Sequence, residues 1–246
     1  MRALTSRILC KDAPALARAV AEKFHYLANN AVPGPFTVAL SGGSTPKLLY
    51  ETLSGEPFRK GIPWERVEFF FSDERAVPPQ HTDSNYRMAW EALLSKVPSQ
   101  AHRMEAEGGE ARVYEQLLRT RVPARRSGIP GFDLLLLGVG PDGHTASLFP
   151  GTEALRERER LVVMNEVPQL QTRRMTCTYP LLNAAKRVWV LASGAAKADV
   201  VRGALAPEIA AGAEERWPIL GVRPDPGELL WWLDEAAAGK SVNRAQ

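Results

Sequence analysis

The chain has 246 residues, of which 45% are hydrophobic, and it carries 31 basic against 28 acidic side chains. This apolar content can fill a core and excludes an intrinsically disordered protein. The charge balance is too even to indicate nucleic-acid binding, although it would not repel an anionic small molecule.

No apolar run is long enough to span a membrane, and residues 1–12 lack the apolar centre of a secretory signal. The two cysteines, Cys10 and Cys177, do not have the spacing of a disulfide or zinc framework. We therefore expect a cytoplasmic protein that acts on a small molecule, with no membrane attachment and no obligate protein partner.

Strand and helix signals alternate along the chain without a linker, which favours one domain over residues 1–246. The first helix is expected after Asp12, a capping residue, with Pro14 in the first turn and an apolar stripe through Leu16, Val20 and Phe24. Near the other end, residues 229–233 are expected to form a strand, followed by a capped helix over residues 234–238.

Four predicted strands share one pattern in which an apolar run ends in a loop and a helix follows. They are residues 36–40, 67–71, 132–137 and 187–191. The third contains four consecutive leucines and so has no polar face, which is typical of a parallel strand covered on both sides. Crossover connections between parallel strands bring all four loops to the carboxyl edge of the sheet, where ligands bind in open α/β folds. We expect one cleft there.

The loop after the first of these strands, Ser41-Gly-Gly-Ser-Thr-Pro46, is suited to holding an oxyanion. It offers two glycines for close backbone approach and two hydroxyl donors, which are Gly42, Gly43, Ser44 and Thr45. Pro46 fits the first position of the helix that follows, whose amino terminus would point free amides at the anion. An ordinary capped turn is the alternative interpretation of this loop.

Two cations follow other strands of the set, Arg75 after residues 67–71 and Lys197 after residues 187–191. Both would add the positive charge that phosphate recognition needs, although either could be a surface cation.

Asp142 and His144 follow the leucine-rich strand, at the start of a predicted helix. A histidine at the cleft edge is a candidate general base, because imidazole titrates near neutral pH. On a helix, Asp142 would not face a residue two positions away. It could cap the helix, orient substrate hydroxyls or set the imidazole from the loop, and these roles stay open.

Other motifs indicate no cofactor and no metal. Residues 138–143 match G-x-G-x-x-G, but they carry Pro141 and Asp142 where a dinucleotide needs bare backbone. The spacing of a Walker loop and of a G-x-S-x-G nucleophile elbow is absent from the sequence. His81-Thr-Asp83 alone is too weak to predict a metal site.

Several motifs, in this order along the chain, resemble those of the 6-phosphogluconolactonase family. They are Ser41-Gly-Gly-Ser-Thr-Pro46, Ser72-Asp-Glu-Arg-Ala-Val-Pro78, His81-Thr-Asp-Ser-Asn-Tyr86, Gly140-Pro-Asp-Gly-His-Thr-Ala-Ser-Leu-Phe-Pro150 and Trp232-Leu-Asp-Glu-Ala-Ala237. The resemblance implies a three-layer α/β/α sandwich with a mostly parallel central sheet, shared with glucosamine-6-phosphate deaminase and ribose-5-phosphate isomerase. It also implies hydrolysis of 6-phospho-D-glucono-1,5-lactone in the pentose phosphate pathway.

The resemblance further implies roles for single residues. It places the substrate phosphate among Ser44, Thr45, Arg75 and Lys197, with Arg174 as a further candidate whose register is ambiguous because Arg173 precedes it. Asp73 matches an active-site aspartate of the deaminases and could bind sugar hydroxyls or water. With His144 and Asp142, it completes the expected catalytic set.

Two alternatives remain at this point. Glucosamine-6-phosphate deaminases resemble the chain in the glycine loop and in an Asp-Gly-His segment, but they carry a glutamate where this chain has Phe149. A sugar-phosphate-binding module without catalysis would keep the anion loop and could dispense with His144.

Overall fold

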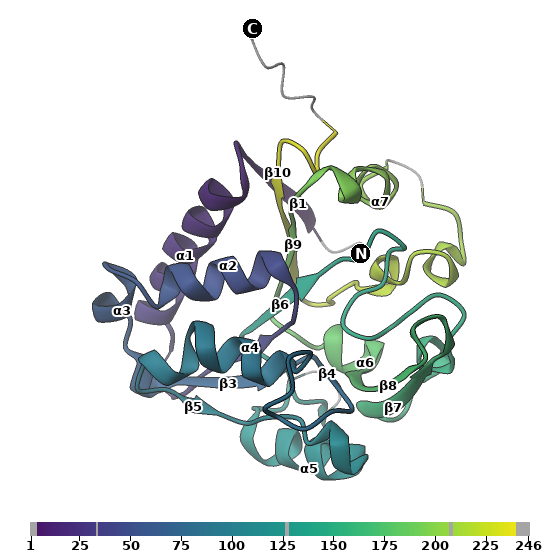
Figure 1. The fold of residues 1–246 in the computed structure, drawn as a ribbon, viewed down its shortest axis with the longest axis horizontal. Coiled ribbons are helices and arrows are strands. Elements are labelled where there is room, and N and C mark those ends of the chain that lie inside the picture. Colours follow the sequence, from purple (N-terminus) through teal and green to yellow (C-terminus); the bar gives the residue numbers. More distant parts are fainter. Residues whose placement is uncertain (1–3, 33, 126–127, 207–208, 240–246) are drawn as a thin grey trace, which may run out of the picture.

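The computed structural model describes residues 4–32, 34–125, 128–206 and 209–239, so parts of the expected domain over residues 1–246 and of the segment 1–12 lie outside the described residues. Its centre is a seven-stranded sheet in the order β1-β10-β9-β6-β2-β3-β5, in which every neighbouring pair is parallel (Figure 1). The strands are β1 (Leu4–Cys10), β2 (Phe36–Leu40), β3 (Val67–Phe71), β5 (Gln100–Ala101), β6 (Leu134–Gly138), β9 (Arg187–Ala192) and β10 (Glu228–Asp234).

Helices cover both faces of this sheet and give the three-layer α/β/α arrangement (Figure 1). One face carries α1 (Ala13–Asn29), α2 (Ser44–Leu53), α3 (Phe58–Gly61) and α4 (Asn85–Ala92). The other side carries α5 (Ala111–Arg121), α6 (Tyr179–Leu182) and α7 (Ala198–Ala204). The chain adds strands in one direction across the sheet up to β5 and in the opposite direction from β6 onward. Right-handed crossovers therefore place the helices before β5 on one face and the later helices on the other.

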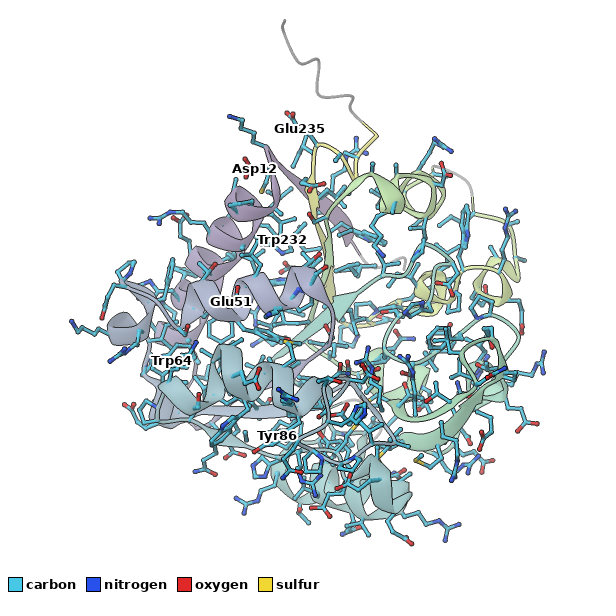
Figure 2. The ribbon with its side chains drawn as sticks, in the orientation of Figure 1. Asp12, Glu51, Trp64, Tyr86, Trp232 and Glu235 are labelled. Atoms are coloured by element: carbon cyan, nitrogen blue, oxygen red, sulfur yellow. The ribbon has the colours of Figure 1, made fainter. Side chains whose placement is uncertain are left out.

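Local sequence explains how the main elements begin and what they bury. The Asp12 carboxylate caps α1 by accepting a hydrogen bond of 2.9 Å from Ala15 N, and it lies at the amino end of that helix in Figure 2. Residues 134–137, the leucines of β6, are 0% exposed, which confirms that this strand is covered on both faces. Burial of each leucine contributes about 1.5–3 kcal/mol.

A second sheet, which the sequence did not predict, packs beside the carboxyl edge of the first (Figure 1). It is antiparallel and consists of β4 (Asp73–Arg75), β8 (Thr172–Cys177) and β7 (Val162–Val167). Its register sets Arg75 directly opposite Arg174. Side chains alternate along a strand, so Arg173 points the other way and pairs with Glu166 at 2.7 Å.

Two predicted helices are absent from the described structure. Residues 139–150 form turns and an isolated bridge, because Gly143 and Ala146 have φ values of +79° and +47°, which an α-helix does not permit. Residues 235–239 form a turn. The Asp234 carboxylate, which was expected to cap a helix there, accepts a bond from Ala237 N and also one from Gly194 N in the loop after β9. No helix within the described residues combines the length and the apolar character needed to cross a membrane.

Candidate active site

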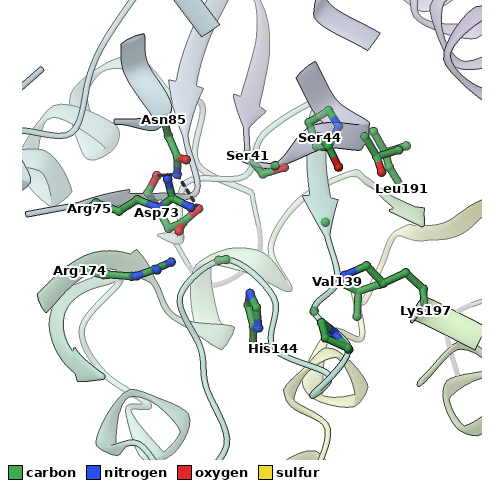
Figure 3. A pocket seen from close by; sticks show the side chains of 18 residues that line it. Ser41, Ser44, Asp73, Arg75, Asn85, Val139, His144, Arg174, Leu191 and Lys197 are labelled. Carbon is green, nitrogen blue, oxygen red and sulfur yellow. Dashed lines mark hydrogen bonds between the residues drawn. The ribbon is translucent and has the colours of Figure 1, made fainter. Parts of the chain in front are cut away.

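A cavity of about 200 Å³ opens at the carboxyl edge of the parallel sheet (Figure 3). Its wall combines the loops that follow β2, β6 and β9 with side chains from β4, β8 and the start of α4. Strands far apart in sequence therefore supply one site, as the parallel arrangement predicts.

Nine of the ten residues that the sequence singles out line this cavity. They are Gly42, Gly43, Ser44, Thr45, Asp73, Arg75, His144, Arg174 and Lys197. The tenth, Asp142, stands behind His144 and does not belong to the wall. The roles assigned to these residues stay predictions.

His144 and Asp142 form a hydrogen-bonded pair in the loop after β6. His144 Nδ1 lies 2.6 Å from Asp142 Oδ1, and the same oxygen accepts a bond of 3.2 Å from His144 N. Burial raises the pKa of Asp142, but the hydrogen bond from the ring and the charge of His144 outweigh it and lower the pKa below its ordinary value. An ionised carboxylate only accepts, so Nδ1 must be the donor. In a neutral ring, Nε2 is then left as the proton acceptor.

The loop conformation makes this pair possible. Gly143 has a φ of +79°, so Asp142 and His144 are not held at helical spacing, and their side chains can meet. This geometry is the one expected if Asp142 sets the imidazole from the loop, one of the three roles that the sequence left open, and that role stays a prediction. The helix-capping role is wrong because no helix begins here.

Phe149 supports the imidazole from its face. The two rings stack with centroids 4.1 Å apart and planes 20° apart. The guanidinium carbon of Arg174 lies 5.2 Å from the centroid of the same phenyl ring. Phe149 thus links the candidate base to one of the cations, a role that sequence reasoning missed.

Asp73 is 4% exposed, and protein groups already occupy both of its oxygens. Ser147 Oγ donates to Oδ2 at 2.6 Å, and Asn85 Nδ2 lies 3.3 Å from Oδ1. Asp73 therefore braces the loop after β6 while facing the cavity. Asn85 also lines the cavity, and sequence reasoning assigned it no role although it lies in the His81–Tyr86 motif, one of those that resemble the family.

The glycine loop presents an uncapped helix amino terminus. Helix α2 begins at Ser44, and no side chain of the described residues caps it, so its first amides are free to bind an anion. A Cβ on Gly42 would lie 1.9 Å from Asn85 Oδ1, which explains why only glycine fits there. Pro46 is the third helical residue and not the first, but its missing N–H is still one of the unpaired amides of the first turn.

The cations form two groups on opposite sides of the cavity (Figure 3). Arg75 and Arg174 lie together with Asp73, whereas Lys197 lies on the side of Ser44, with His144 between the groups. Like charges directly opposite in a sheet destabilise it, so the arginine pair favours an anion between them. Burial and the charge of Arg75 lower the pKa of Arg174, and burial lowers the pKa of Lys197. Bound anions would reverse both shifts.

Three residues of the cavity wall also contain buried polar atoms that lack a partner among the described residues. Ser41 Oγ, Arg75 Nε and Arg174 Nε are buried without a hydrogen-bond partner among the described residues, and all three residues line the wall. Leaving such groups unpaired costs about 1–3 kcal/mol each, and the wall around them is rich in polar side chains that suit a polar ligand. Among the described residues there is no cluster of three His, Cys, Asp or Glu side chains suited to a metal ion.

Comparison with known proteins agrees with the geometry. The model of the family glucosamine-6-phosphate isomerases/6-phosphogluconolactonase matches residues 11–231. A 6-phosphogluconolactonase of Nostoc sp. is 42% identical over 215 residues, which cover 84% of this chain and 85% of the relative. One of Synechocystis sp. is 41% identical over 83% of this chain and 84% of its own. The structure of 6-phosphogluconolactonase from Trypanosoma brucei is 30% identical, with a TM-score of 0.83 over 99% of this chain and 100% of that chain.

Proposed function

Because the chain belongs to the glucosamine-6-phosphate isomerase/6-phosphogluconolactonase family, we propose that it hydrolyses 6-phospho-D-glucono-1,5-lactone to 6-phosphogluconate, a step of the pentose phosphate pathway. The observation that carries the proposal is the Asp142–His144 pair, set between two groups of cations in one cavity. Its substrate is a free small molecule, and action in the cytoplasm is part of the same proposal.

The two cation groups match the two negative charges of the reaction. The substrate carries a phosphate throughout, and a second charge develops on the carbonyl oxygen when water attacks. The free amides of α2 and the Lys197 ammonium suit the phosphate. Arg75 and Arg174 lie across the cavity, and Phe149 connects Arg174 to the His144 ring, so this pair suits the oxyanion. This proposal assigns Arg75 to the oxyanion, whereas the family resemblance had implied that it binds the phosphate.

His144 carries the proton through the reaction. Nε2 removes a proton from water as the oxygen attacks the lactone carbonyl, and the imidazolium is stabilised by Asp142 through Nδ1. When the tetrahedral intermediate collapses, the ring C–O bond breaks and Nε2 returns the proton to the leaving hydroxyl. This transfer restores neutral His144, and the new carboxylic acid then releases its own proton to solvent.

Deamination of glucosamine 6-phosphate is the competing reaction within the family. The resemblance assigns a glutamate in deaminases to the position of Phe149, and here a phenyl ring stacks on His144 at that place. An apolar ring cannot exchange a proton with the histidine. The contact therefore favours the lactonase.

The test supplies fresh 6-phosphogluconolactone and glucosamine 6-phosphate to the enzyme in separate assays. We expect acid release from the lactone well above the spontaneous rate, and no ammonia from the amino sugar. Ammonia release without faster acid release would replace the lactonase by a deaminase. Binding of 6-phosphogluconate without turnover of either compound would leave a binding module.

A further inference from the structure

The end of β10 contacts the loop after β9 but does not line the cavity. Asp234, the last residue of β10, is 5% exposed, and it does not belong to the cavity wall. Its carboxylate accepts a bond of 2.6 Å from Ser193 Oγ to Oδ2, bonds of 3.1 Å from Gly194 N to both oxygens, and one of 2.7 Å from Ala237 N to Oδ1. A buried carboxylate thus joins the end of β10 to the loop after β9.

That loop carries Lys197 to the cavity. Gly194 turns the chain with a φ of +92°, and its carbonyl oxygen accepts a bond of 3.0 Å from Lys197 N. Asp234 therefore holds the residue that in turn holds the Lys197 backbone. Three hydrogen bonds to one buried carboxylate thus attach residues 193 and 194 to the end of β10.

The Lys197 side chain depends on this attachment. It forms no ion pair with a described residue, and its ammonium is influenced only by burial and by the more distant charge of Asp142. With no partner to hold the side chain, the position of the backbone sets the region of the cavity that the ammonium can reach.

We propose that Asp234 is a positioning residue, whose carboxylate fixes the loop of residues 193–197 so that Lys197 meets the phosphate of the ligand. The proposal rests on the function proposed above, in which Lys197 binds that phosphate. It gives a role to the segment Trp232-Leu-Asp-Glu-Ala-Ala237, which the reaction itself does not use.

Asp234→Asn is the test substitution. The amide keeps the shape but replaces one acceptor oxygen by a donor, so in either orientation Ser193 Oγ or Ala237 N loses its acceptor. We expect the Kd for 6-phosphogluconate and the KM for the lactone to rise about tenfold, the effect of losing one hydrogen bond to a charged group. Affinity for gluconate, which has no phosphate, and kcat should change by less than about twofold.

A double-mutant cycle separates positioning from general damage. Lys197→Ala should weaken 6-phosphogluconate binding at least as much as Asp234→Asn, and the double variant should be no weaker than Lys197→Ala alone. Ser193→Ala, which removes a single donor, should give a smaller effect of the same kind. Asp133→Asn is the matched control, because Asp133 accepts three hydrogen bonds at the opposite edge of the sheet and should leave phosphate affinity unchanged.

Two results would overturn the proposal. One is a Kd for 6-phosphogluconate in Asp234→Asn equal to that of the wild type. The other is a double variant in which the increase in Kd equals the product of the increases in the two single variants. Such independent losses would mean that Asp234 does not act through Lys197. Failure of the proposed function is distinct, because it appears as a wild-type enzyme that does not accelerate lactone hydrolysis, whatever the binding constants.

Discussion

The chemistry at the scale of single residues depends on how neighbours constrain two side chains, His144 and Lys197. Asp142 fixes the tautomer of His144 through Nδ1, and Phe149 fixes the plane of its ring. Lys197 has no such partner in the part of the chain that the structure describes, and burial lowers its pKa. The proposed base, His144, is thus held by side chains, whereas Lys197, the proposed phosphate-binding residue, is positioned through its backbone.

The lowered pKa of Lys197 predicts how ligand affinity changes with pH. The ammonium should lose its proton at a lower pH than the ordinary lysine value of 10.5, so the affinity for 6-phosphogluconate should begin to fall below that pH. The phosphate is already a dianion there and does not contribute to the fall. Calorimetric titration with 6-phosphogluconate from pH 8 to pH 10.5 measures this fall in affinity, and circular dichroism verifies that the protein stays folded.

Lys197→Arg is the control for this titration, because a guanidinium stays charged across the whole range. Its affinity should change little with pH, even if it is weaker throughout. Equal falls in Lys197→Arg and in the wild type would show that another group is responsible.

At the scale of elements, the sequence predicted the strands that carry the site. The strands β2, β3, β6 and β9 coincide with the four expected apolar runs, because continuous burial leaves a strong signal in the sequence. The antiparallel sheet was missed because its strands are short or carry polar residues, as Thr172–Cys177 does. Without that sheet, the pairing of Arg75 with Arg174 could not be foreseen.

The wrong helices have a common physical cause. The helix expected at Asp142 fails because positive φ values at Gly143 and Ala146 break it, and the sequence gives no sign of the latter. The helix expected after Asp234 remains a single turn, although Asp234 Oδ1 accepts the capping bond from Ala237 N, because Gly239 has a φ of +72°.

Packing between elements yields a prediction about Gly203 in α7. A Cβ there would lie 1.7 Å and 2.0 Å from Cζ3 and Cη2 of Trp217, and a Cβ on Gly143 would lie 2.7 Å from Cδ1 of the same indole. Trp217 thus fills the space between α7 and the loop that carries His144. Gly203→Ala should lower the free energy of unfolding by about 1–3 kcal/mol through overpacking, measured by urea denaturation.

Gly108→Ala is the matched control for this prediction, since a Cβ on Gly108 meets no atom within 4 Å. Its free energy of unfolding should stay within roughly 0.5 kcal/mol of the wild type. Similar losses in both variants would mean that helix α7 and Trp217 are not packed as described.

At the scale of the whole molecule, the parallel sheet explains why the site exists. Loops from strands separated by more than a hundred residues meet because every strand of the sheet runs the same way. The second sheet closes this edge and brings Arg174, and the loop after β6 adds Asp142 and His144. Fold and cleft follow from the sequence pattern, but the division of the cations into two groups required the structure.

The most direct test of this account is the turnover of His144→Ala on 6-phosphogluconolactone, with its affinity for 6-phosphogluconate measured in parallel. If His144 is the base beside a separate phosphate site, kcat should fall by about 100-fold or more while product affinity stays nearly unchanged. Full turnover in His144→Ala would contradict the account.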